Sequence, residues 1–166
     1  MRFETLFAAL AAASPAVGRA LTFNSAFVSA ATLNYNWHVT EWKAGCSTGD
    51  CVYEFDIAGA ANATSKPPRP EFKAFCSGHG EGAEYALCEN QFNGTTPYVV
   101  VAKLQESNNS TTNGTRSATI QVSFIYETDD YIRYNYTGQA TSAYNELSST
   151  RSHFAITPDQ LSAVAK

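Results

Sequence analysis

Short runs of alternating apolar and polar residues constrain this 166-residue chain more than any other feature. In the run Cys51–Ala58, Tyr53 and Phe55 fall on one side, and Glu54 and Asp56 fall on the other. Alternation with a period of two places successive side chains on opposite faces of a β-strand. The two carboxyl groups have a spacing that a glycosidase could use, but the aromatic face belongs in a core. We therefore expect the acidic face to be solvent-exposed surface.

Similar runs recur at short intervals, separated by turns rich in Gly, Asn and Asp. One of them, YVVVAKLQ over Tyr98–Gln105, is typical of a strand buried on both faces. No long segment of helical period lies between the runs. The pattern predicts an all-β fold, a small antiparallel β-barrel or sandwich. The predicted strands are Asn34–Lys43, Cys51–Ala58, Glu71–Ser77, Ala83–Glu89, Tyr98–Gln105, Ala118–Tyr126 and Tyr131–Thr137.

A short helix is expected near the C-terminus. Thr157 can serve as the N-cap, Pro158 suits the first helical position, and Gln160 stands three residues after the cap. Leu161 and Val164 then supply a short apolar stripe. This segment is predicted to be a single peripheral helix.

The N-terminal segment has the pattern of a secretory signal peptide. Arg2 supplies a positive charge, and an apolar run follows over Thr5–Ala13. We expect cleavage to remove residues 1–20, with Ala16 as the competing cleavage position, and to leave residues 21–166 as one domain. No later run approaches the roughly 18 apolar residues that a membrane helix needs. The expected location is therefore secreted and extracellular, with no membrane span.

Four cysteines stand in the expected mature chain, and an oxidising compartment predicts two disulfides among three possible pairings. Local pairing is favoured. Cys46 and Cys51 flank the turn sequence Ser-Thr-Gly-Asp, and Cys76 and Cys88 flank the Gly-rich loop Gly78–Gly82. A zinc site is the alternative, but neither pair has Cys-x-x-Cys spacing. We expect no metal and no cofactor.

Six Asn-x-Ser/Thr sequons permit N-glycosylation where the asparagine is accessible. Asn135 ranks last because it stands in a strand-like run, and the adjacent Asn108 and Asn109 will rarely both carry glycans. The asparagines expected to carry glycans are Asn62, Asn93, Asn108 and Asn113.

Four short segments resemble one known group of proteins. In order, they are Trp37-His-Val-Thr-Glu-Trp, Phe55-Asp-Ile, Phe75-Cys-Ser and Cys88-Glu-Asn-Gln-Phe. Together they resemble the fungal secreted proteins typified by the Alternaria major allergen. The resemblance implies a β-barrel-like fold, secretion by a fungus, and a role as an elicitor of plant cell death, a binder of plant defence proteins or an allergen.

Two departures from that group bear on assembly. The typical allergen has an N-terminal cysteine that links a dimer, whereas no cysteine precedes Trp37 in this chain. It also has a second disulfide towards the C-terminus, for which Cys46 and Cys51 look like a local substitute. We therefore expect no covalent dimer.

Catalytic motifs are weak. The sequence has no Gly-x-Ser-x-Gly elbow and no phosphate-binding loop, and its net charge of −4 disfavours nucleic acid as a partner. A ribonuclease-like enzyme could use His38 and His153 with Glu41 and Arg133. However, His38 and Glu41 lie three residues apart on a predicted strand, which would turn them to opposite faces. We expect a non-enzymatic protein.

Binding is the better-supported alternative, because tyrosines concentrate around one predicted hairpin. A tyrosine has an apolar ring and a hydrogen-bonding tip, which suit recognition of proteins or sugars. The Gly78–Gly82 loop is a second candidate contact, and the competing interpretation is that the tyrosines line the core. The candidate binding residues are Tyr126, Tyr131, Arg133, Tyr134 and Tyr136.

The favoured function is that of a secreted effector, elicitor or allergen-like protein. It would bind a host extracellular or membrane-surface protein and trigger or modulate plant defence. The alternatives are a protein that binds a glycan or the cell wall, and a secreted ribonuclease-like enzyme.

Overall fold

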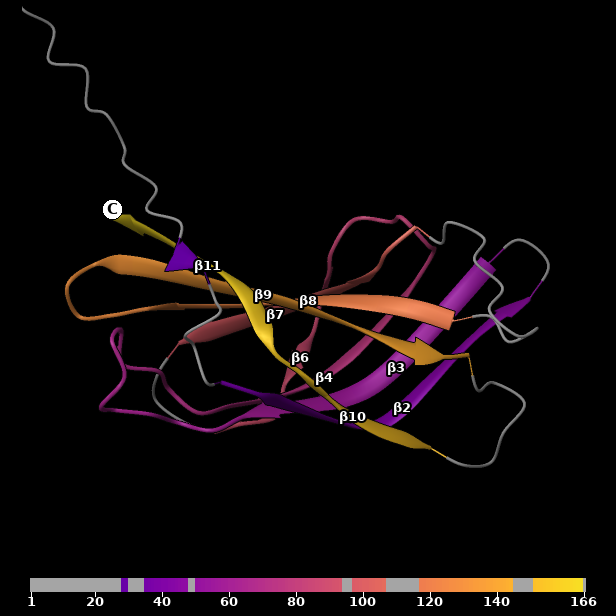
Figure 1. Ribbon diagram of the computed structural model, residues 1–166, viewed down its shortest axis with the longest axis horizontal. Coiled ribbons are helices and arrows are strands. Elements are labelled where there is room, and N and C mark those ends of the chain that lie inside the picture. Colours follow the sequence, from indigo (N-terminus) through magenta and orange to yellow (C-terminus); the bar gives the residue numbers. More distant parts are fainter. Residues whose placement is uncertain are drawn as a thin grey trace, which may run out of the picture.

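The computed structural model describes residues 28–29, 35–47, 50–93, 97–106, 117–144 and 151–165. Within these ranges the regular structure is β, arranged as two antiparallel sheets that face each other as a sandwich (Figure 1). The predicted all-β class is confirmed, although the hydrogen-bonded ladders do not close into a barrel. No helix in the described part of the chain is long and apolar enough to cross a membrane.

Six strands form the first sheet, in the order β1–β11–β9–β8–β7–β5. Their bounds are β1 Val28–Ser29, β5 Ala86–Leu87, β7 Tyr98–Leu104, β8 Ser117–Glu127, β9 Ile132–Ala143 and β11 Pro158–Ala165. Five strands form the second sheet, in the order β10–β2–β3–β4–β6. Their bounds are β2 Trp37–Ser47, β3 Asp50–Gly59, β4 Phe72–His79, β6 Glu89–Asn90 and β10 Ser152–Ile156.

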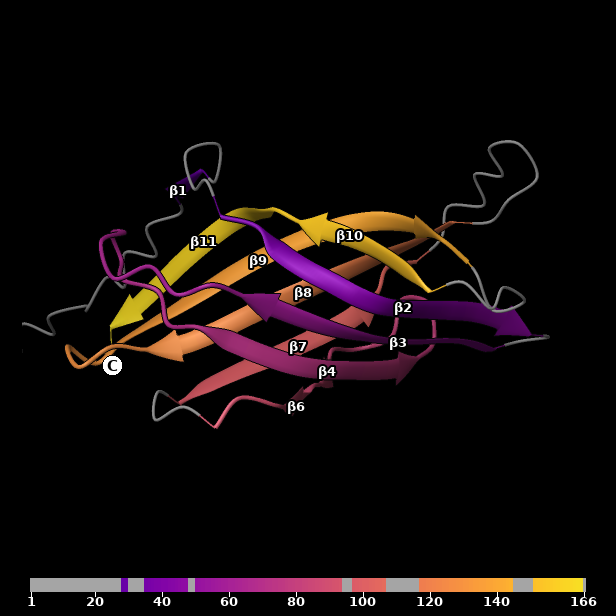
Figure 2. The same ribbon diagram turned by 90° about the horizontal axis from the view of Figure 1, so that it is seen from below.

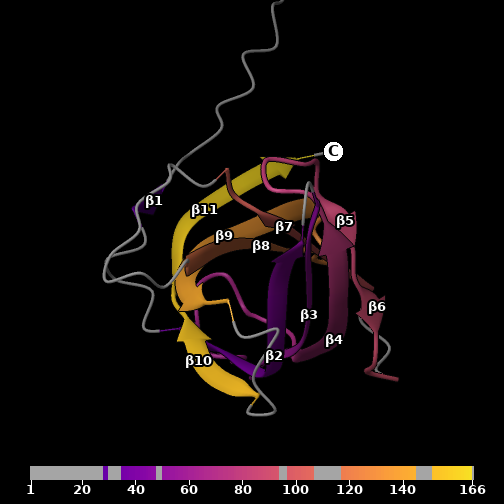
Figure 3. The same ribbon diagram turned by 90° about the vertical axis from the view of Figure 1, so that its right-hand side faces the viewer.

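The chain crosses from one sheet to the other at both edges of the sandwich, as the end-on view shows (Figure 3). On one edge β10 leaves the second sheet at Ile156, and β11 enters the first at Pro158. On the other edge only Cys88 separates β5 from β6, and its amide donates to the Val100 carbonyl at 2.9 Å. Strands that change sheet in this way form the corners of a sandwich.

The helix expected near the C-terminus is wrong, since Pro158–Ala165 is strand β11. Pro158 pairs with Gly138 of β9, and Leu161 pairs with Tyr136 and is buried. The Thr157 hydroxyl donates to the Asn36 side-chain oxygen at 2.7 Å and does not cap a helix. A helix cap is worth about 1 kcal/mol, which a full ladder to β9 and an apolar side chain in the core together outweigh.

The core lies between the inner faces of the two sheets. The predicted alternation of β3 is confirmed, because Tyr53 and Phe55 are buried while Glu54 and Asp56 lie on the outer face. The strands run side by side at a shallow slant (Figure 2). Aromatic rings meet between the sheets, where Phe72 of β4 stacks on Phe124 of β8 with centroids 4.2 Å apart. Apolar burial of this kind is the main favourable term in folding.

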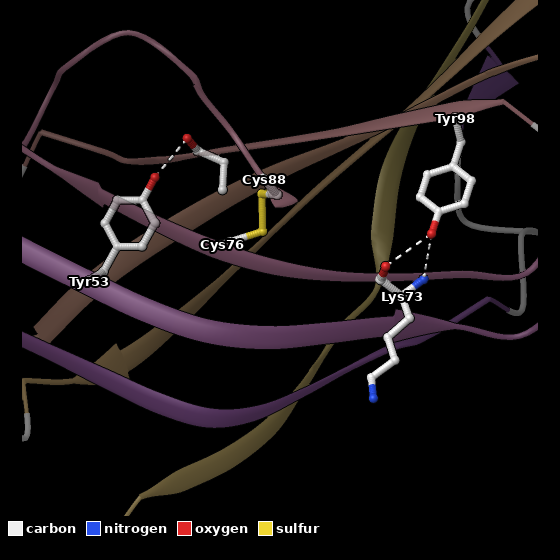
Figure 4. Close-up of a disulfide and its surroundings, with 6 residues drawn as sticks. Tyr53, Lys73, Cys76, Cys88 and Tyr98 are labelled. Carbon is white, nitrogen blue, oxygen red and sulfur yellow. Dashed lines mark hydrogen bonds between the residues drawn. A yellow bond between two sulfur atoms is a disulfide. The ribbon is translucent and has the colours of Figure 1, made fainter. Parts of the chain in front are cut away.

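Both predicted disulfides are confirmed. Cys46 and Cys51 are register partners across the β2–β3 hairpin. Cys76 of β4 is fully buried and is bonded to Cys88, the residue at which the chain changes sheet (Figure 4). The disulfide therefore covalently joins the second sheet to one of the two crossing segments.

Two tyrosine hydroxyls also tie the sheets together near that disulfide (Figure 4). Tyr53 of β3 donates to the Ala102 carbonyl of β7 at 2.8 Å. Tyr98 of β7 donates to the Lys73 carbonyl at 3.0 Å and accepts from the Lys73 amide at 3.1 Å. Because both phenols are buried, each hydroxyl needs such a partner.

Candidate functional site

The turn between β8 and β9 holds a tyrosine in an unfavourable backbone conformation. The Thr128 amide donates to the Ile132 carbonyl, and the Tyr131 amide donates to the Thr128 carbonyl, both at 3.0 Å. This closure puts Tyr131 at φ 58°, in the left-handed region. Glycine or asparagine is the usual residue there, and a bulky side chain costs about 1 kcal/mol or more. The Tyr131 side chain is nonetheless 72% exposed.

The predicted binding tyrosines divide into two groups. Tyr126 and Tyr136 are buried in the core, where their rings stack with centroids 6.2 Å apart. The competing interpretation, that the tyrosines line the core, therefore holds for these two. Tyr134 is half-buried and stacks on Tyr126 at 5.5 Å, and Tyr131 stands outside at the tip. Only Tyr131 and Tyr134 offer ring area to a partner.

A groove runs between this hairpin and the loop that precedes β4, with a volume of about 530 Å³. Both loops lie at the same end of the sandwich (Figure 1). The lining of the groove includes two prolines of the loop before β4, which we call the proline wall, the stacked tyrosine pair, and acidic residues of the turn, which we call the acidic rim. We call it the hairpin groove; its lining residues are Ala63, Pro68, Arg69, Pro70, Tyr126, Glu127, Thr128, Asp129, Asp130 and Tyr134.

Arg69 fixes the proline loop on the end of the core. It is only 7% exposed, and its guanidinium lies 4.0 Å from the centre of the Tyr35 ring, an attractive cation–π contact. Its backbone pairs with Asn62 in both directions, at 2.9 and 3.0 Å, and the Tyr126 hydroxyl donates to the Pro68 carbonyl at 2.9 Å. These contacts hold the proline loop in place and so define one side of the groove.

Burial raises the pKa values of the phenols beneath the groove. It raises the pKa of Tyr35 to about 12, although the nearby Arg69 charge acts in the opposite direction. Burial also raises the pKa of Tyr126 and of Tyr136. A phenol with an ordinary pKa of about 10 is already neutral at pH 7, and these shifts extend the neutral range further, so the positive charge of Arg69 faces rings and not phenolates.

Arg133 does not line the hairpin groove. It lies on the outer face of β9, where its Nη2 and Nε donate to one Glu127 oxygen at 2.8 and 3.0 Å. It borders a second, mainly apolar hollow that includes Val99 and Ile125. Since Glu127 lines both hollows, the ion pair forms the ridge between them.

The Gly78–Gly82 loop, the other predicted contact, is tied to both sheets. The Gly80 amide donates to the Cys51 carbonyl at 2.8 Å, and the Gly82 amide donates to the Leu104 carbonyl at 3.0 Å. Between them, the Glu81 carboxylate accepts from the Tyr144 hydroxyl. This loop therefore closes the sandwich at the end of the molecule away from the hairpin groove.

The sulfur atoms of Cys46 and Cys51 lie with a Glu81 oxygen within 4.8 Å of one another. Both sulfurs are committed to the disulfide, so they are not available as thiolate ligands for a metal.

The predicted sequons fall into different settings. The Asn62 side-chain oxygen accepts from the Thr64 amide and the Ser65 amide, both at 3.0 Å, beside the mouth of the hairpin groove. Asn93 is exposed, whereas Asn135 lies inside β9 between β8 and β11. The predicted signal peptide and three sequons lie outside the described residues; these sequons are Asn108, Asn109 and Asn113.

The structure changes one premise about the ribonuclease-like residues. Glu41 has φ 58° and forms a bulge in β2, so the simple alternation that would turn it away from His38 breaks there. His153 of β10 lies opposite this bulge, and the Glu41 carboxylate pairs with Arg151, not Arg133. His38 and His153 are both exposed, on the open face of the second sheet.

Sequence reasoning identified the hairpin but missed the opposite wall of the groove. Pro68, Arg69 and Pro70 were recognisable only as an extended, proline-rich connection, because no local pattern says which loop lies beside a distant hairpin. In the comparisons with known proteins, no family model, no curated protein and no solved structure matches the chain.

Proposed function

We propose that this protein is secreted by a fungus and acts without catalysis, as an effector, elicitor or allergen-like protein. In this proposal it binds a host extracellular or membrane-surface protein through the β8–β9 hairpin and thereby triggers or modulates plant defence. The two disulfides and the signal-like N-terminal segment support export, and the sequence resemblance to fungal elicitors supports the setting.

One observation carries the proposal of a binding role. Tyr131 is a large, 72% exposed aromatic at a position whose backbone conformation favours glycine. A turn selected only for stability would avoid this arrangement, and strained residues of this kind cluster at binding sites. Exposed tyrosines are also among the residues that contribute most to protein interfaces.

The test compares three forms of the purified, secreted protein on plant leaves at graded doses. Tyr131→Gly removes the exposed ring and relieves the backbone, so the fold is kept. Tyr85→Ala is the matched control, because Tyr85 is 37% exposed and bonds to Gln121 on the outer face of the first sheet. We expect cell death or a defence response with the wild type and the control, and its loss with Tyr131→Gly.

A photo-cross-linking residue at position 131 adds a direct readout on the same tissue. We expect a covalent adduct with a host extracellular protein that excess unlabelled wild type suppresses. A leaf response that Tyr131→Gly leaves intact, or no response and no adduct at any dose, would remove the proposal.

Carbohydrate binding is the second candidate, because exposed Tyr131 stands beside the exposed carboxylates Asp129 and Asp130. A ring next to hydrogen-bond acceptors is a pattern that suits sugars. Pull-down on chitin and glucan, with Tyr131→Gly and Tyr134→Ala, tests it; equal retention of all forms would exclude the hairpin. Digestion of total RNA, compared with His38→Ala and His153→Ala, tests the ribonuclease alternative.

A further inference from the structure

We infer that the hairpin groove takes an extended, proline-containing segment of the partner protein that carries a lysine or arginine. This inference rests on the proposed function and names the chemistry of its ligand. It follows from three properties of the groove: the aromatic and proline side chains that line it, the negative charge of its rim, and the hydrogen bonds that hold its two loops in place.

The floor and wall suit proline rings. Tyr126 and Tyr134 stack at 5.5 Å and present the half-buried Tyr134 ring, and Pro68 and Pro70 line the same groove. Grooves lined by aromatic rings are the recurring receptors for proline-rich segments, whose extended conformation exists before binding. Such a segment loses little conformational freedom when it docks.

The rim suits a cation. Two exposed aspartates, Asp129 and Asp130, line the hairpin side of the groove, and the Glu127 carboxylate beside them is paired with Arg133. The one cation of the lining, Arg69, is 7% exposed with its guanidinium over Tyr35, so its charge faces the core. A rim of this sign attracts a basic side chain and repels an acidic one.

The groove is formed before any ligand arrives. The Asn62–Arg69 backbone pair and the bond from Tyr126 to the Pro68 carbonyl hold the proline wall. The closed Thr128 turn holds the acidic rim. A site held in this way binds without first ordering its own loops, and its volume of about 530 Å³ lies in the range of ligand pockets.

The test uses blocked synthetic peptides that place arginine between prolines, with matched peptides in which citrulline replaces arginine. Citrulline keeps the shape of arginine and removes its charge. Calorimetry measures affinity, and amide chemical shifts of the wild type map the site without any variant. We expect the arginine peptide to shift the amides of residues 126–134 and to bind up to about fivefold more tightly than the citrulline peptide.

Variants then separate the two contributions. Asp129→Asn with Asp130→Asn should weaken the arginine peptide up to about fivefold and leave the citrulline peptide unchanged, whereas Tyr134→Ala should weaken both. Tyr134→Phe, which keeps the ring, is the rescue variant should Tyr134→Ala fail to fold. Asp159→Asn, an exposed aspartate of β11, is the matched charge control and should bind as the wild type does. Added salt should weaken the arginine peptide.

Several results would overturn the inference. They are equal affinity for arginine and citrulline peptides, an equal effect of Asp159→Asn, shifts that map away from the groove, or binding of chitin or glucan oligosaccharides in the groove in place of peptide. The experiments distinguish failure of this inference from failure of the proposed function. If Tyr131→Gly abolishes the leaf response and the host adduct while no peptide binds, the proposed function stands and the basic proline-containing ligand is excluded.

Discussion

At position 131 the chain places a tyrosine where the turn geometry favours glycine, and it leaves the ring in solvent. Glu41 has the same φ of 58°, but its carboxylate is paired with Arg151 on the neighbouring strand β10. The positive φ has a different structural effect at each of the two residues. At Glu41 it forms a bulge within a sheet, whereas at Tyr131 it exposes a ring beside the hairpin groove. Under the proposed function, position 131 is therefore where stability and binding make opposite demands.

Tyr131→Gly should stabilise the fold while it removes binding. Glycine adopts a positive φ without strain, so we expect the free energy of unfolding to rise by about 0.5–1 kcal/mol. Urea denaturation measures the change. Tyr131→Ala, which keeps the strain and loses the ring, is the control and should show no gain; a stability of Tyr131→Gly at or below that of the wild type would contradict the argument.

At the scale of elements, patterns of period two were reliable where one face had to be buried. They predicted β3 and its acidic outer face, because a one-residue slip would turn Phe55 into water. They failed where tertiary pairing decided the outcome. Pro158–Ala165 has helix-like start signals but pairs with β9. The run Tyr98–Gln105 was expected to be buried on both faces, although Val99 within it is 43% exposed. A β-branched run does not reveal whether anything covers its second face.

Removing the Cys76–Cys88 disulfide should cost more than removing Cys46–Cys51. The first closes 12 residues and the second closes 5, which correspond to about 3 and about 2 kcal/mol of loop entropy. The fully buried Cys76 adds a packing loss. We expect a lower urea midpoint for the paired alanine variant at 76 and 88 than for the pair at 46 and 51. Equal midpoints would refute this order.

Gly138 of β9 lies where the chain crosses between sheets. A Cβ there would stand 2.8 Å from the Pro158 Cα and 2.9 Å from the Ile156 Cγ2, too close to both. Gly138→Ala should therefore lower the free energy of unfolding by about 1–3 kcal/mol, measured by urea denaturation. Gln139→Ala, at the exposed neighbour, is the control and should change it by less than about 0.5 kcal/mol. Similar losses for the two variants would show that the crossing tolerates a methyl group.

At the scale of the molecule, the two ends of the sandwich differ in structure. One end carries the hairpin groove, and the other is closed by the Gly78–Gly82 loop with its bonds to Cys51 and Leu104. The sequence predicted the tyrosine hairpin but not which tyrosines are buried, because Tyr126 and Tyr134 share a strand face and differ only in what lies over them. Only the fold brings Pro68 and Arg69 to the hairpin.

The stability of the whole molecule should fall at alkaline pH. Burial raises the pKa of Tyr35 and of Tyr53 to about 12, above the value of about 10 in an unfolded chain. The unfolded state therefore loses these protons first. Stability should be unaffected below about pH 10 and then decline towards pH 12, by up to about 1.4 kcal/mol per pH unit for each phenol.

Urea denaturation between about pH 8 and pH 11, together with phenolate absorbance, measures this decline. Tyr53→Phe removes one of these buried phenols and should reduce the slope by one proton. A slope that Tyr53→Phe does not alter would contradict the assignment.

The two crossings between sheets have a further consequence, for behaviour at high concentration. A long free strand edge exposes unpaired amides and carbonyls that can recruit another chain and seed fibrils. The outermost strands of the described sheets are short: β1, β5 and β6 have 2 residues each, and β10 has 5. The chain passes directly from β5 in the first sheet to β6 in the second, and from β10 in the second sheet to β11 in the first. These short borders offer another chain less free edge to extend than full-length edge strands would, which disfavours edge-to-edge aggregation at high concentration.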